Sequence, residues 1–310
     1  MGKNIIIILI ILGLAVSGLF FLRMGNGGRP SGDVAAKKLE VVASFYPLYF
    51  IAVEIGGDRA AVSDIVPAGA EPHEYEPTAR DMAKMENSRI IIMNGAGLEA
   101  WGENVEKNID AGKTTIIWAG EGLAARQMER DGQAETDPHI WLDPSLVRQM
   151  AGKIAQAFQQ ADPENADYYG SNAAALESRL DGLDREYRQG LAGCAEKNII
   201  TAHSAFGYLA DAYGFNQVAI AGLSPDAEPS LRDLAGISRF AKDNGVKYIF
   251  FESLASPKLS ETIANEVGAK TLVLDPIEGL SDEDLSRGKN YLTVMRENLA
   301  NLRIALECAK

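Results

Sequence analysis

The sequence predicts an α/β fold of two similar lobes, each built on a parallel sheet and joined to the other by one long helix. Short β-rich runs alternate with helical segments in residues 38–161, and the same alternation returns in residues 193–310. A long helical pattern, 162–192, separates them. The chain has 310 residues, of which 46% are hydrophobic, and this is enough for two cores of ordinary size. Residues 1–37 form a separate signal or anchor segment with a linker.

The first half of the chain contains four runs that predict strands. They are 39–44, 61–66, 89–94 and 114–118. Helical stretches lie between these runs. Thr78 and Asp81 have the spacing of a capping box at the start of one helix. Asp143 followed by Pro144 opens another, because proline suits the first helical position.

The long helical pattern begins near Asp162 and meets no strong breaker before Gly190. Its apolar residues recur mostly at spacings of three and four: Tyr169, Leu176, Leu180, Leu183, Tyr187 and Leu191. A helix of this length extends roughly 40 Å. That is long for a crossover between two strands, so we interpret it as a brace between the lobes.

The second half repeats the pattern of the first. Strands are predicted at 198–202, 217–221, 247–251 and 271–274. Ser230 and Ser256 are expected to cap the helices between them. A final helix is expected over 289–308.

The N-terminus predicts export. Lys3 precedes an apolar run, 5–22, which is followed by a polar, glycine-rich stretch, 23–33. This pattern fits either a secretory signal or a short membrane anchor, and both place the rest of the chain outside the cytoplasm. Small residues at 34–36 fit a cleavage site but lie far from the apolar run, so an uncleaved anchor stays open. Because no cysteine lies near the run, we expect a periplasmic or cell-surface protein without a lipidated cysteine.

Two cysteines, Cys194 and Cys308, lie in the exported part. An oxidising compartment permits one disulfide between them. Two free thiols are the alternative, because the sequence does not say whether the two residues approach each other.

Three histidines and an aspartate follow predicted strands or precede a helix. His73 follows the second strand, His139 precedes the helix opened by Asp143, His203 closes the fifth strand, and Asp275 follows the last strand. Parallel sheets bind ligands at the carboxyl ends of their strands, so these side chains are expected to converge in the cleft between the lobes. Three imidazoles and one carboxylate suit a tetrahedral divalent metal such as Zn²⁺.

Six segments carry a resemblance that covers the chain from about residue 38 to its end. They are 45–47, 72–78, 137–144, 201–208, 251–253 and 275–276. With these segments the chain resembles the metal-binding solute-binding proteins of zinc and manganese ABC importers. The resemblance implies two lobes on a rigid helix, and a metal held in the cleft by His73, His139, His203 and Asp275. It also implies an ABC-type permease as the partner.

The same resemblance bears on which metal is bound. Members tuned to manganese usually carry glutamate at the position of His203, so the third histidine favours Zn²⁺, with Mn²⁺ as the alternative. Many zinc-specific members carry a histidine-rich loop before the second ligand, but the stretch 121–135 contains no histidine here.

Two further acidic residues lie near the expected ligands. Glu71 is either an outer ligand beside His73 or a solvated loop carboxylate. Glu252 follows the strand 247–251 and either orients an imidazole from outside the ligand shell or caps a helix at the rim of the cleft.

These observations predict extracytoplasmic, high-affinity capture of a divalent transition metal and its delivery to an ABC importer. Four protein ligands would close the site, which argues against an enzyme. Two alternatives remain: an exported zinc hydrolase with Asp275 as general base, and a carrier of a metal chelate or vitamin. The net charge of −13 argues against a nucleic-acid partner. We expect a monomer.

Overall fold

Two four-stranded sheets, each entirely parallel, form the framework of residues 37–130 and 133–309, which the computed structural model describes. The strand order is β2-β1-β3-β4 in the first sheet and β10-β9-β7-β8 in the second. The first contains β1 (Leu39–Ala43), β2 (Ala60–Asp64), β3 (Ile90–Met93) and β4 (Thr115–Trp118). The second contains β7 (Asn198–Thr201), β8 (Asn216–Ala219), β9 (Tyr248–Phe251) and β10 (Lys270–Val273). The predicted fold class is confirmed.

Helices separate the strands of both sheets. In the first half they are α2 (Tyr46–Gly56), α3 (Ala79–Asn87), α4 (Gly102–Asn108) and α5 (Pro144–Ala161). In the second half they are α7 (Gly207–Tyr213), α8 (Leu231–Asp243), α9 (Lys258–Val267), α10 (Asp282–Ser286) and α11 (Tyr291–Ala305). Among these described helices none is both long and apolar enough to span a bilayer. The apolar run 5–22 lies outside the described residues.

Alternate residues of the strands enter cores on opposite faces of each sheet, as the two-residue period of a strand requires. Val41 points into the main core, which also contains buried residues of α2, α5 and α6, whereas Val42 packs with residues of α3 and α4. In the second sheet Ile199 enters the main core, and Ile200 packs with residues of α8 and α9. Both faces of each sheet are therefore covered by helices, which leaves the strand ends as the place for a site.

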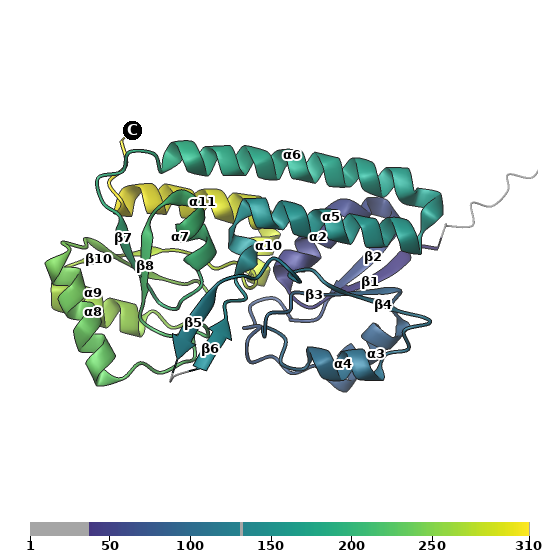
Figure 1. Cartoon of the computed structure of the whole chain (residues 1–310), viewed down its shortest axis with the longest axis horizontal. Coiled ribbons are helices and arrows are strands. Elements are labelled where there is room, and N and C mark those ends of the chain that lie inside the picture. Colours follow the sequence, from purple (N-terminus) through teal and green to yellow (C-terminus); the bar gives the residue numbers. More distant parts are fainter. Residues whose placement is uncertain (1–36, 131–132, 310) are drawn as a thin grey trace, which may run out of the picture. The chain divides into compact units, whose positions relative to one another are not determined.

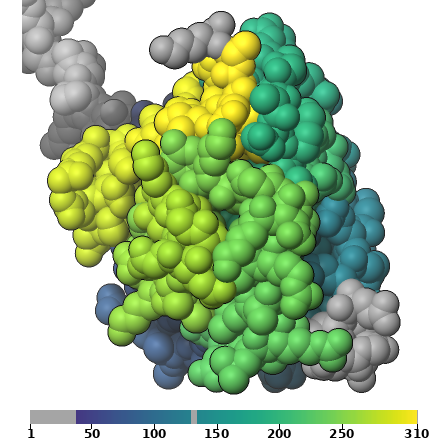
Figure 2. Space-filling view, turned by 90° about the vertical axis from the view of Figure 1, so that its left-hand side faces the viewer, coloured from purple at the N-terminus to yellow at the C-terminus, as the bar shows by residue number. Residues whose placement is uncertain are grey.

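The long helix α6 (Ala166–Gly190) runs along both halves of the described chain (Figure 1). Its buried stripe contributes to the main core that both lobes share: Tyr169, Ala173, Leu176, Leu180, Leu183 and Tyr187. Arg179 pairs with Glu54 of α2, and Glu186 pairs with Arg296 of α11. Figure 2 shows the yellow atoms of α11 directly beside the teal atoms of α6. The helix is thus fixed to both lobes, as expected of a brace.

Several local predictions can be compared with the structure. Thr78 and Ser230 each form a capping box, as the sequence indicates. Ser256 is not the cap of α9, because the helix begins one residue later and Pro257 takes that position. A hairpin of β5 (Gln127–Arg130) and β6 (Gln133–Thr136) was not predicted.

The structure joins Cys194 and Cys308 in a disulfide that closes a sequence separation of 114 residues. A cross-link of this span removes much conformational freedom from the unfolded chain.

We therefore expect Cys308→Ser to lower the free energy of unfolding by about 2–5 kcal/mol. Urea unfolding with and without a reductant measures this. The variant should not respond to reductant, whereas the wild type should lose the same amount on reduction. Equal stability of the two proteins under oxidising conditions would contradict the expectation.

Candidate metal centre

Three histidines and one glutamate meet at the carboxyl ends of strands from both lobes. They are His73, His139, His203 and Glu278, and one nitrogen or oxygen from each lies within 4.8 Å of the others. His73 belongs to the loop after β2, His139 stands directly before a short 3₁₀ turn, Ile140–Leu142, and His203 follows β7. The structure thus brings together the three histidines that the sequence singles out.

The distances between the facing atoms suit a small tetrahedral ion. Glu278 Oε1 lies 3.2 Å from Nε2 of His73, of His139 and of His203. The Nε2 atoms of His139 and His203 are 3.3 Å apart. Zinc bonds of about 2.0–2.1 Å in a regular tetrahedron place neighbouring ligand atoms roughly 3.3–3.4 Å apart. The three distances to Glu278 and the one between His139 and His203 are therefore close to this spacing, and the remaining pairs of facing atoms lie within 4.8 Å.

Buried carboxylates orient two of the imidazoles. Nδ1 of His139 lies 2.8 Å from Asp137 Oδ1, and Nδ1 of His203 lies 2.6 Å from Glu252 Oε1. A proton on Nδ1 that is donated to a carboxylate leaves the Nε2 lone pair free to face the centre. The same two carboxylates also accept the backbone N–H groups of His139 and His203, so they fix both the ring and the main chain.

The protonation of the metal-free centre follows from these neighbours. Burial lowers the pKa of His203, but the charges of Glu252 and Glu278 outweigh this effect and raise the pKa well above its ordinary value. Burial also lowers the pKa of His139, and hydrogen bonds to Asp137 and Glu278 raise it overall. Since the charge of His203 and hydrogen bonds from the imidazoles outweigh burial, the pKa of Glu278 falls well below its usual range. Protonated His139 and His203 therefore pair with the Glu278 carboxylate, whereas burial lowers the pKa of His73.

Glu71 lies at the edge of this group. Its Oε1 accepts the backbone N–H of His73 at 3.0 Å, and it also neighbours Glu278. Burial, followed by the charge of Glu278, raises the pKa of Glu71 to about 8. Glu71 is thus a half-buried carboxyl beside the centre.

Asp275, which the sequence indicates as the fourth ligand, lies outside the group. Its Oδ1 accepts the backbone N–H of Ile277 at 2.7 Å, and its Oδ2 accepts the hydroxyl of Ser253. Both oxygens are thus engaged within the second lobe. Glu278, three residues later, points to the histidines instead, although no motif in the sequence marks it as a ligand.

A pair of hydrogen bonds joins the two lobes next to the centre. Trp141 Nε1 donates to the carbonyl of Pro276 at 2.7 Å, and Tyr291 Oη donates to the carbonyl of Trp141 at 2.7 Å. Trp141 follows His139 by two residues, and Pro276 precedes Glu278 by two. The ligands of the first and second lobes are therefore held in register through a buried tryptophan.

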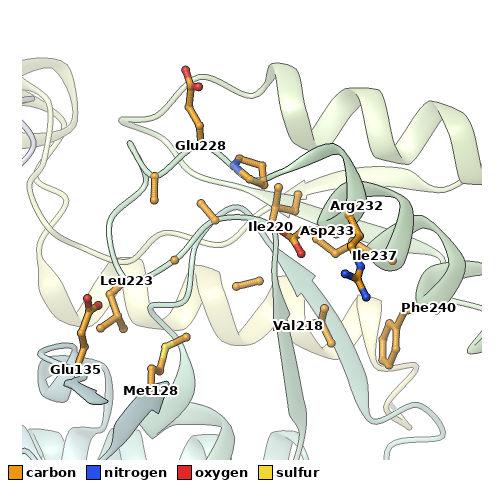
Figure 3. A pocket seen from close by; sticks show the side chains of 16 residues that line it. Met128, Glu135, Val218, Ile220, Leu223, Glu228, Arg232, Asp233, Ile237 and Phe240 are labelled. Atoms are coloured by element: carbon orange, nitrogen blue, oxygen red, sulfur yellow. The ribbon is translucent and has the colours of Figure 1, made fainter. Parts of the chain in front are cut away.

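A hollow of about 670 Å³ is lined by residues other than the four of this centre. Figure 3 shows Met128 and Glu135 of the hairpin on one side and Ile237 and Phe240 of α8 on another. None of its described lining residues is a histidine. The chemistry that the sequence predicts thus belongs to the tight polar cluster, not to this wider hollow.

The family described as the periplasmic component A of zinc-uptake complexes matches residues 41–305. The high-affinity zinc uptake system protein ZnuA of Bacillus subtilis is 37% identical over 305 residues, which cover 94% of this chain and 96% of that protein.

A second group of relatives is longer. The zinc-binding lipoprotein AdcA of Streptococcus pneumoniae is 37% identical over 300 residues, which cover 93% of this chain but only 59% of AdcA. The crystal structure of the Zn(II)-bound ZnuA-like domain of that AdcA has a TM-score of 0.76 and 38% identity. It covers 87% of this chain and all of that domain, 100%.

Proposed function

Because this chain belongs to the family of the periplasmic component A of zinc-uptake complexes, we propose that it captures Zn²⁺ outside the cytoplasmic membrane and delivers it to an ABC permease. The observation that carries the proposal is the cluster of His73, His139, His203 and Glu278. Zinc is the cargo of this site, held until the permease accepts it. The name of the Bacillus subtilis relative, a high-affinity zinc uptake system protein, supports the same reading.

Zinc is favoured over manganese by the atoms that face the centre. Three imidazole nitrogens and one carboxylate oxygen form a nitrogen-rich set, which suits zinc, whereas manganese prefers more oxygen. The 3.2 Å separations also match a small tetrahedral shell. We therefore expect Mn²⁺ to bind only as a weak competitor.

A binding role is favoured over catalysis. Four protein ligands complete a tetrahedral shell, whereas a catalytic zinc keeps one position for water or substrate. A hydrolase would need Asp275 as its general base. Both oxygens of Asp275 instead accept hydrogen bonds, from Ile277 and from Ser253. The site thus suits capture and release of an ion.

One chain supplies all four ligands, so binding does not need a second copy. Delivery to a membrane permease requires the protein to work on the outer side of the cytoplasmic membrane, in agreement with the periplasmic family description. How the protein is retained there depends on residues 1–36, which lie outside the described part.

A competition titration of residues 38–310 tests the proposal. Chelator-stripped protein is titrated with Zn²⁺ against a chromogenic chelator, and then with Mn²⁺. We expect one tight zinc site per chain that manganese does not displace. Absence of tight zinc binding would reject zinc capture.

Removing the carboxylate behind His203 should weaken zinc binding without removing a ligand. We expect Glu252→Ala to lower zinc affinity by about 10–100-fold, because outer partners of ligating histidines typically have effects of this size. Glu252→Gln keeps an acceptor for Nδ1 of His203, so its zinc affinity should lie between those of Glu252→Ala and the wild type. Chelator competition measures both. Wild-type affinity in Glu252→Ala would show that the carboxylate does not support the imidazole.

Zinc binding should release protons and weaken as the pH falls. The pKa of His203 is raised well above its ordinary value in the metal-free protein, so the imidazole carries a proton near neutral pH that zinc must displace. Each displaced proton makes the affinity about tenfold weaker per pH unit of acidification. Calorimetry in two buffers of different ionisation enthalpy counts these protons. An affinity that stays constant from about pH 8 to pH 6 would contradict histidine ligation.

A further inference from the structure

A strained turn stands directly before Glu278. Ile277 has φ of +56°, in the left-handed region of backbone conformation. For a β-branched residue this conformation is rare and energetically unfavourable, so the surrounding structure must hold it in place. Glycine or asparagine would adopt it far more readily.

Asp275 stabilises this turn through two hydrogen bonds of its carboxylate. Its Oδ1 accepts the backbone N–H of Ile277 at 2.7 Å, and its Oδ2 accepts the hydroxyl of Ser253. A side-chain oxygen bonded to the N–H two residues later is the usual way in which an aspartate closes a tight turn. Asp275 is buried, so water competes little for these bonds.

Asn298 of α11 also stabilises the turn, through two hydrogen bonds of its side-chain amide. Its Oδ1 accepts the backbone N–H of Asp275 at 2.9 Å, and its Nδ2 donates to the carbonyl of Asp275 at 2.7 Å. Both bonds are buried. The amide therefore fixes the main chain of Asp275 on both sides, and through it the start of the turn.

The bond from Trp141 to the carbonyl of Pro276 fixes the middle of the turn. The Ile277 side chain itself is fully buried in the main core. Glu278 then emerges with Oε1 at 3.2 Å from each of the three Nε2 atoms. A return of Ile277 to an ordinary negative φ would reverse the local direction of the chain and carry the Glu278 carboxylate away from the imidazoles.

We propose that Asp275 and Asn298 are positioning residues, which hold Ile277 in the left-handed conformation and thereby direct the Glu278 carboxylate to the metal. Asp275, which the sequence indicates as a ligand, therefore acts indirectly, because it positions the glutamate that binds the metal. This role rests on the proposed zinc capture and specifies how the fourth ligand is selected.

Two substitutions at one position separate positioning from ligation. Asp275→Ala removes the acceptor for the Ile277 N–H, and zinc affinity should fall by about 10–100-fold. Asp275→Asn keeps an oxygen at the same place but removes the charge, so it should restore affinity to within about threefold of the wild type. A carboxylate ligand could not be replaced by an amide in this way.

Zinc K-edge X-ray absorption supplies a readout that a general loss of stability would not change. Wild type and Asp275→Asn should give the same shell of three imidazoles and a carboxylate, whereas Asp275→Ala should keep the imidazoles and exchange the carboxylate for water. If Asp275→Ala does not fold, Asn298→Ala releases the turn from the other side and should show the same exchange.

Equal losses in Asp275→Ala and Asp275→Asn would overturn the proposal, because the charge of Asp275 would then matter. Unchanged affinity and spectra in both Asp275→Ala and Asn298→Ala would overturn it as well. Failure of the wild type to bind zinc is a separate outcome, which rejects zinc capture itself.

Discussion

Replacing His203 by alanine is expected to weaken zinc binding by about two to three orders of magnitude. Structural zinc sites with four ligands bind with apparent free energies of about 10–16 kcal/mol, so one ligand in four accounts for roughly 2.5–4 kcal/mol. His203 is fully buried, and its Nε2 faces both Glu278 and His139. The truncation also removes the Nδ1 contact of Glu252, which keeps only the backbone N–H of residue 203, and this destabilises the second lobe.

Chelator competition on the wild type and His203→Ala measures this loss. Asn216→Ala is a suitable control, because this exposed residue lies on β8 beside β7 but not near the centre. It should retain wild-type affinity. Tight zinc binding by His203→Ala would show that the ion is held elsewhere.

Glu278→Gln is expected to lower zinc affinity by about 100-fold or more, a loss similar to that of His203→Ala but with a different cause. The substitution keeps the shape of the side chain but removes the only negative charge among the four facing groups. A neutral amide binds a divalent ion less strongly than a carboxylate does. Glu252 and, after it, Glu278 are the charges that raise the pKa of His203, so the loss of the second charge should reduce the number of protons released on zinc binding.

Glu283→Gln provides the matched control, since Glu283 is exposed on the nearby helix α10 and pairs with Arg287. Affinity and proton release are measured by calorimetry for both variants. If Glu278→Gln bound zinc as tightly as the control, the carboxylate at 278 could not be a ligand.

Much of the fold follows from patterns that the sequence shows directly. The eight strands of the two sheets and the long helix α6 are marked by apolar runs and by spacings of three and four. The hairpin β5–β6 was missed because its strands, Gln127–Arg130 and Gln133–Thr136, are polar and lack alternation. A strand with few apolar residues leaves little trace in the sequence.

The site could be predicted only in part. The positions of His73, His139 and His203 follow from the rule that ligands gather at strand ends. Asp275 satisfies the same rule, yet in the structure Glu278 lies with the three histidines and Asp275 does not. The position of Glu278 beside the histidines depends on the left-handed backbone of Ile277. This conformation is rare for isoleucine, so the sequence does not predict it. Only the contacts of Asn298 and Trp141, distant in sequence, reveal it.

The most direct test of zinc capture is a crystal structure of residues 38–310 grown with zinc, with anomalous data collected at the zinc edge. We predict a single strong peak bonded to Nε2 of His73, His139 and His203 and to a carboxylate oxygen of Glu278. A peak at any other place, or one bonded to Asp275 instead of Glu278, would contradict this assignment.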